Sequence, residues 1–142
     1  MNSPVLTHTF EFDTDNKVLL CRLHGRVTDE SMRRVYGDIR KWSSTVEARA
    51  GIFDLSLIES FDVSTAMMLT LAQEEPAMIG GAARPRVMVA PTAESFGMCR
   101  MFQMVGEEKR HRLSVVRTLE EAYAVLGLQA VRFEPLERPD SN

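Results

Sequence analysis

Residues 50–73 read AGIFDLSLIESFDVSTAMMLTLAQ, and this stretch decides the fold. Its beginning is an apolar run that predicts a buried strand, and its end predicts a helix that is apolar on almost every side. Between the two lies a turn crowded with Asp and Ser. A buried strand that leads directly into a helix is typical of an α/β domain, in which the helix crosses over to a parallel strand.

The sequence on both sides of this stretch continues the alternation of strands and helices. Residues 7–13, THTFEFD, alternate apolar and polar side chains, and a short turn separates them from a second strand at 18–24, so an antiparallel hairpin is expected. Gly25 is expected to end that second strand. The further elements predicted by periodicity and capping residues are a helix from Thr28 to about Ser44, a strand at 86–90, a helix at 95–105, a strand at 113–116 and a helix opened by Thr118 and Glu121.

The order β-β-α-β-α-β-α-β-α predicts a single α/β domain. We expect a mixed, mainly parallel sheet of about five strands with the hairpin at its edge, and about four helices. The 142 residues are enough for one buried core. We place the domain at residues 1–128 and a C-terminal extension at 129–142, because the extension holds two prolines and several charges. Val131 and Phe133 are expected to pack back onto the domain.

Composition argues against several classes of partner. The net charge of −3, from 17 basic and 20 acidic residues, gives no electrostatic reason to expect nucleic-acid binding. Charges interrupt the apolar runs before they reach membrane-spanning length, and no signal-peptide pattern is present, so no membrane span is expected. Cys21 and Cys99 lie in apolar runs, which predicts buried thiols in a cytoplasmic protein. The histidines lack ligand spacing, so we expect neither a metal nor a cofactor.

The sequence shows no recognisable catalytic motif. It contains no G-x-S-x-G elbow, no phosphate-binding loop and no dinucleotide glycine pattern. Glu74 and Glu75 are adjacent carboxylates, but neighbouring helix residues point apart, so the pair is interpreted as a solvated helix end. The sequence therefore predicts a protein that is not an enzyme.

The turn before the apolar helix is the strongest candidate for a functional site. It holds Asp62, Ser64 and Thr65 where the carboxyl end of a parallel strand meets a helix N-terminus, the edge at which open α/β sheets bind ligands and partners. A phosphate added to a hydroxyl in this place faces backbone N–H groups and the positive end of the helix dipole. Capping of the helix by Asp62 or Ser64 is the alternative, since such residues open most helices.

The same turn resembles the signature of the STAS domain, the fold of bacterial anti-sigma factor antagonists. Asp54-Leu55-Ser56 is followed, eight residues after Asp54, by Asp62-Val63-Ser64-Thr65 and an apolar helix, and the last helix begins T-L-E-E-A. In that family the pattern is a strand ending in D-L-S, then D-S-S-G-L. The chain is therefore similar to a divergent branch, grouped as SpoIIAA-like or STAS/Sec14-like, because Val63 and Thr65 replace a serine and a glycine.

The resemblance implies a non-enzymatic regulatory module that binds a protein partner. In the family that partner is an anti-sigma factor with kinase activity, and it phosphorylates a serine at the start of the second helix. By position, Ser64 matches this phospho-acceptor and Asp62 matches the acid before it. The candidate partner-binding residues around Ser64 are Asp62, Val63, Thr65, Met67 and Met68.

Methionines are concentrated on the two central helices. Seven of the nine lie between Met67 and Met104, and both helices are apolar on several sides. Such surfaces suit adaptable binding, so a site for a small apolar ligand between these helices is the alternative function. Burial of both helices, or a homodimer that covers them, would also explain the pattern, and a homodimer is our expectation.

Overall fold

The computed structural model describes residues 8–79, 81, 83–105 and 112–137. They form one α/β unit with a six-stranded sheet, in the order β5-β4-β3-β2-β1-β6, and four helices. The strands are β1 (His8–Asp13), β2 (Val18–Thr28), β3 (Ala50–Asp62), β4 (Arg86–Val89), β5 (Leu113–Val116) and β6 (Glu134–Leu136). The helices are α1 (Asp29–Thr45), α2 (Thr65–Met78), α3 (Ala93–Val105) and α4 (Leu119–Val125).

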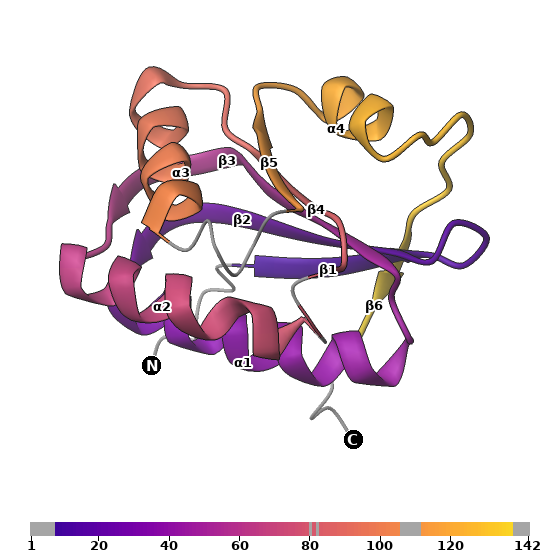
Figure 1. Cartoon of the computed structure of the whole chain (residues 1–142), viewed down its shortest axis with the longest axis horizontal. Helices are drawn as coiled ribbons and strands as arrows, with labels where there is room; N and C mark the ends of the chain where they lie inside the picture. Colours follow the sequence, from indigo (N-terminus) through magenta and orange to yellow (C-terminus); the bar gives the residue numbers. More distant parts are fainter. Residues whose placement is uncertain (1–7, 80, 82, 106–111, 138–142) are drawn as a thin grey trace, which may run out of the picture.

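The sheet is mixed and mainly parallel, as the sequence predicts. Strands β2, β3, β4 and β5 run parallel to one another, and β1 is antiparallel to β2. The expectation that the hairpin forms the edge is wrong, because β6 pairs antiparallel with the outer side of β1. In Figure 1 the chain runs from α4 around the sheet to this outer position. The boundary at residue 128 stays a prediction, but part of the predicted extension adds a strand to the sheet.

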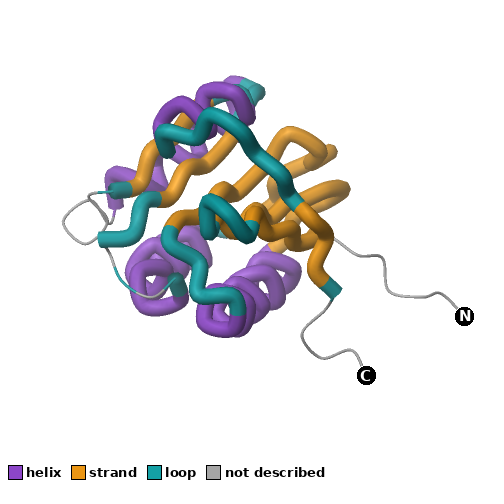
Figure 2. The backbone as a smooth tube through the Cα atoms, turned by 90° about the vertical axis from the view of Figure 1, so that its right-hand side faces the viewer, coloured by secondary structure: helices purple, strands orange, loops and turns teal. Residues whose placement is uncertain are grey.

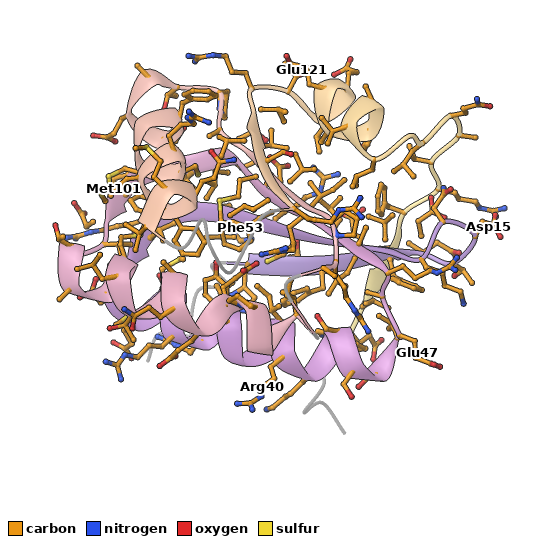
Figure 3. The ribbon with its side chains drawn as sticks, viewed as in Figure 1. Asp15, Arg40, Glu47, Phe53, Met101 and Glu121 are labelled. Atoms are coloured by element: carbon orange, nitrogen blue, oxygen red, sulfur yellow. The ribbon has the colours of Figure 1, made fainter. Side chains whose placement is uncertain are left out.

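The helices divide between the two faces of the sheet. One face packs its larger apolar cluster against α1, α2 and α3, which contribute residues such as Tyr36, Leu71 and Phe102. The other face packs a smaller cluster against Ala122 of α4. Figure 2 shows α1 and α2, the two longest helices, side by side below the sheet, with α4 above it. Phe53 points into the interior between the sheet and the layer of α1 and α2, whereas Arg40 points away from the protein (Figure 3).

Local sequence signals account for the helix ends. The Thr28 hydroxyl accepts a hydrogen bond from the Ser31 backbone N–H at 3.2 Å, and the Ser31 hydroxyl accepts one from the Thr28 N–H at 2.8 Å. Thr118 and Glu121 form the same reciprocal capping box at the start of α4, as predicted. The predicted helix start at Thr28 is therefore confirmed, with Thr28 as the N-cap.

Strands β2 and β3 are longer than the sequence suggests. Gly25 does not end β2, because its φ of 73° accommodates an irregularity, and pairing with β3 continues to Thr28 opposite Asp62. The Asp- and Ser-rich turn that the sequence predicts around Asp62 is therefore shorter than expected, because β3 continues to Asp62 itself. Only Val63 and Ser64 separate β3 from α2. The D-L-S segment is therefore inside a strand, and the functional turn is very short.

Asp13 anchors the chain segment that leads to β6. Its carboxylate accepts hydrogen bonds from the backbone N–H groups of Arg132, at 2.8 Å, and Asn16, at 3.0 Å. Asp13 is fully buried, which by itself raises the pKa of its carboxyl, but these donors together hold that pKa below the ordinary value. Phe133 packs against the smaller apolar cluster and stacks on Tyr123, as expected, whereas Val131 is 37% exposed.

Candidate functional site

Ser64 is the N-cap of α2 and lies at the carboxyl end of β3. Its backbone is extended, and its hydroxyl oxygen accepts a hydrogen bond from the Met67 N–H at 3.1 Å. The capping interpretation of this serine is thus correct, and the side chain is nevertheless exposed at the surface. In Figure 1 the ends of β2 and β3 and the starts of α1 and α2 lie together at the left of the molecule. Ser64 therefore sits where two helix N-termini meet.

Asp29, the first residue of α1, is the closest partner of Ser64 outside α2. The Asp29 carboxylate accepts the Ser64 backbone N–H at 2.7 Å and the Ser64 hydroxyl at 2.8 Å, one on each oxygen. These two hydrogen bonds, helped by the positive charge of Arg33, lower the pKa of Asp29 from its ordinary value of 3.8. The carboxylate therefore joins the start of α1 to the start of α2.

Asp29 was not among the predicted site residues, and its link to Ser64 was missed. The register of the β2–β3 pair predicts this contact. Thr28 lies opposite Asp62 in the parallel β2–β3 pair, so the residues that follow each strand are brought side by side. A prediction of the register to the ends of both strands would have placed Asp29 next to Ser64.

Charged side chains surround the pair. The Arg26 Nε lies 2.9 Å from an Asp62 carboxylate oxygen, and both side chains are more than half exposed. An exposed pair of this kind adds little to stability. We refer to Arg26, Asp29, Asp62 and Ser64 as the Ser64 cluster. It presents two carboxylates, one guanidinium and one hydroxyl at the surface.

The other predicted site residues divide into exposed and buried ones. Thr65 is exposed next to Ser64, so it shares the surface of the Ser64 cluster. Val63, Met67 and Met68 are at most 9% exposed and pack in the larger apolar cluster. Within this chain these three side chains hold α2 on the sheet, and the accessible part of the predicted site consists of Asp62, Ser64 and Thr65.

Most of the described methionines pack into the protein. Met88 is buried, while Met98 and Met101 are partly buried against the larger cluster. The space among Met68, Phe102 and their neighbours measures about 10 Å³, which is close to the minimum for one water molecule. A second cavity, of about 60 Å³, lies at the opposite edge of the sheet, beside Gly51 and Ile79. The small volume of the space beside Met68 and Phe102 gives no support to an apolar-ligand site there, and that site stays a prediction.

Apolar side chains do reach the surface near the ends of these helices. Leu69 of α2 is 41% exposed, and Met104 and Val105 of α3 are 64% and 42% exposed. They are the part of the methionine-rich region that a second protein, or a second copy of this chain, can contact.

Two further titratable groups, Glu75 and Cys99, are buried away from the Ser64 cluster. Glu75 is buried in an ion pair with Arg86, so its interpretation as part of a solvated helix end is wrong. Burial raises the pKa of the Cys99 thiol to about 12, which makes it a poor nucleophile. Among the described residues no group of three His, Cys, Asp or Glu side chains is arranged to hold a metal ion. None of the described helices has the length and apolarity that crossing a membrane requires.

The sheet order and helix placement define the SpoIIAA-like fold, and the resemblance to STAS domains is confirmed at the level of the fold. The chain is similar to the anti-sigma factor antagonist SpoIIAA in its unphosphorylated form, with 13% identity, a TM-score of 0.57, and coverage of 82% of this chain and 94% of that one. It is also similar to the Bacillus cell fate determinant SpoIIAA in the phosphorylated form, with 18% identity, a TM-score of 0.54, and coverage of 82% and 96%.

A third similar structure is an uncharacterised protein of the DUF3478 family with a SpoIIAA-like fold, from Shewanella loihica PV-4. It has 14% identity and a TM-score of 0.54, and the alignment covers 89% of this chain and 98% of that one. No family model and no curated protein matches the sequence. These similarities establish the fold, and the function has to be argued from the site.

Proposed function

We propose that the chain is a non-enzymatic regulatory module that binds a protein partner through the surface around Ser64, and that phosphorylation of Ser64 weakens this binding. The observation that carries the proposal is the position of the Ser64 hydroxyl: exposed, at a helix N-terminus, and at the carboxyl edge of the parallel strands. A kinase can reach a hydroxyl in this position without unfolding the domain. The similar SpoIIAA structures, one unphosphorylated and one phosphorylated, support such a role for this fold.

The chemistry of the switch follows from the charges of the Ser64 cluster. Transfer of a phosphoryl group from a nucleoside triphosphate breaks the Ser64 O–H bond, forms an Oγ–P bond, and releases a nucleoside diphosphate and a proton. The phosphate adds a charge of about −1.5 to −2 at neutral pH. It is added beside Asp29 and close to Asp62. The phosphorylated surface is therefore much more negative than the unmodified surface that the partner binds, and the partner is expected to bind it more weakly.

The proposed partner is a protein of the anti-sigma factor or kinase type, in a cytoplasmic setting that suits the buried thiols of Cys21 and Cys99. Asp62 and Thr65 are the proposed contact residues because they are exposed next to Ser64. Homodimer formation through Leu69 and Met104 is a separate proposal, and light scattering of the purified chain tests it.

Site-specific crosslinking tests the binding surface. A photoreactive amino acid at Thr65 is expected to capture a defined partner in the native cell, whereas the same amino acid at the exposed Val125, on the opposite face, captures none. The non-phosphorylatable variant S64N keeps a good N-cap and is expected to retain the partner under all conditions. Mass spectrometry that finds Ser64 unmodified under every growth condition would refute the phosphorylation, and equal capture from both positions would refute the binding surface.

A further inference from the structure

The contact between Asp29 and Ser64 indicates how a change at Ser64 is transmitted. We propose that the Asp29 carboxylate holds the starts of α1 and α2 together in the unmodified chain. A phosphate on Ser64 displaces this carboxylate from the start of α2, and the start of α1 is then released. This inference rests on the proposed function, since it concerns regulation at the same serine. Asp29 is then a positioning residue, because it acts on the partner surface only through Ser64.

The first step of the argument is that Asp29 uses both carboxylate oxygens on one residue. Oδ1 accepts the Ser64 backbone N–H at 2.7 Å, and Oδ2 accepts the Ser64 hydroxyl at 2.8 Å. Hydrogen bonds to an ionised carboxylate are stronger than neutral ones. The two residues are separated by 35 positions in the chain, so the contact joins two elements instead of stabilising one helix locally.

The second step is that phosphorylation removes one of the two donors of Asp29, the Ser64 hydroxyl, and leaves the Ser64 backbone N–H. The Ser64 hydroxyl loses the proton that it donates to Oδ2, and its oxygen becomes the bridging atom of the phosphate ester. The phosphate oxygens are themselves strong acceptors and carry negative charge at the same place. They compete with the carboxylate for the N–H groups at the start of α2, and two anions within hydrogen-bonding distance repel each other.

The third step is that both anions have nearby cations. Arg33, one turn after Asp29 on α1, already acts on the Asp29 charge. Arg26 at the end of β2 pairs with Asp62 through an exposed contact of low cost to break. A displaced Asp29 is therefore able to turn toward Arg33 while the phosphate attracts Arg26. The capping box of Thr28 and Ser31 does not involve Asp29, so the rest of α1 stays folded.

The test combines phosphoserine at position 64, installed by genetic code expansion, with D29N. The control is E30Q, which removes the same charge one residue away, at a side chain that is 81% exposed and pairs with Arg34. The second pKa of the phosphoserine, followed by phosphorus NMR, is expected to be roughly half a unit higher with Asp29 present than in D29N. In E30Q the second pKa of the phosphoserine should stay closer to its value in the wild-type background. Equal values in D29N and E30Q would overturn the inference.

Amide hydrogen exchange gives a second readout, with alanine variants added for the unphosphorylated chain. Without phosphate, D29A is expected to raise exchange of the Ser64 amide by about tenfold, and E30A is not. Phosphoserine should raise exchange at the start of α1 in the wild-type background but add little in D29N. If phosphoserine abolishes partner capture in D29N as strongly as in the wild type, the switch works without Asp29; the inference is then wrong while the proposed function stands. If D29N lowers the phosphoserine pKa but Thr65 captures no partner in any variant, the contact between Asp29 and the phosphate is supported and the proposed function is wrong.

Discussion

Arg86 and Glu75 form a two-pronged ion pair inside the protein, with Nε to Oε2 and Nη2 to Oε1 both at 2.8 Å. The side chains are 7% and 4% exposed. The pair joins the first residue of β4 to the last turns of α2. Arg86 also donates to the Arg84 carbonyl oxygen at 2.7 Å, which ties the segment before β4 to the same point. Because α2 carries Ser64 at its other end, this pair fixes the helix that presents the candidate site.

Removal of one partner of this pair should be costly. E75Q leaves the buried Arg86 charge without its carboxylate and is expected to lower the free energy of unfolding by about 3–5 kcal/mol. E74Q at the exposed neighbouring residue is the control and should change it by less than about 0.5 kcal/mol. Urea unfolding followed by circular dichroism measures both. Similar midpoints for the two variants would show that the ion pair does not hold α2.

The segment before β6 should depend on Asp13. D13A removes the acceptor of the Arg132 N–H, and we expect a loss of about 1–3 kcal/mol together with faster amide exchange in β6 and in the β1 residues that face it. D15A, an exposed acid in the same turn, is the matched control. If exchange in β6 is as slow in D13A as in the wild type, the strand is held by its pairing with β1 alone.

The methionines of α2 and α3 should differ sharply in their effect on stability. Met67 is 7% exposed, so M67A is expected to cost about 2–5 kcal/mol through loss of buried contacts. Met104 is 64% exposed, and M104A should change stability by less than about 0.5 kcal/mol. Thermal unfolding compares the two. If M104A is as destabilising as M67A and the effect depends on protein concentration, Met104 is covered by a second copy of the chain.

The sequence predicted those features that depend on neighbouring residues. The capping box at Thr118 and the helix start at Thr28 are local patterns, and both are present as expected. The features that were missed depend on residues far apart in the chain. Gly25 looks like a strand end, but it fits into a sheet in which β3 supplies the pairing partners. The role of Asp13 requires Arg132, 119 residues later, and the contact of Asp29 requires the full β2–β3 register.

The same distinction applies to the candidate site. The position of Ser64 at a strand-to-helix turn followed from the pattern of residues 50–73, because a strand must be followed by a helix start somewhere in that segment. The burial of Val63, Met67 and Met68 did not follow, since an apolar helix in sequence does not reveal which of its faces meets the sheet. Packing of α2 between α1 and α3 decides that question.

The capping role of Ser64 should be separable from its role as a proposed phospho-acceptor. S64A removes the acceptor of the Met67 N–H and is expected to lower the free energy of unfolding by about 1–2 kcal/mol. S64N restores a capping acceptor and should recover most of this loss. S44A at an exposed serine of α1 controls for the substitution itself. If S64A has the stability of S44A, the cap contributes nothing, and S64A becomes the simpler variant for partner-binding experiments.

The ionisation of Asp29 should be visible in the pH dependence of stability. The pKa of Asp29 is lower in the folded chain than its ordinary value of 3.8, because the Ser64 N–H and hydroxyl donate to the charged form. A lowered folded-state pKa means that the unfolded chain binds the proton more readily, so the stabilisation is complete well above pH 3.8 and is lost as the pH falls through the folded-state value. The difference in unfolding free energy between wild type and D29N should therefore be constant from about pH 5 to 8 and shrink below about pH 4. Urea unfolding across this range measures the difference, and E30Q is the control without such a contact. A difference that does not change down to pH 3 would mean that Asp29 and Ser64 are not hydrogen bonded in solution.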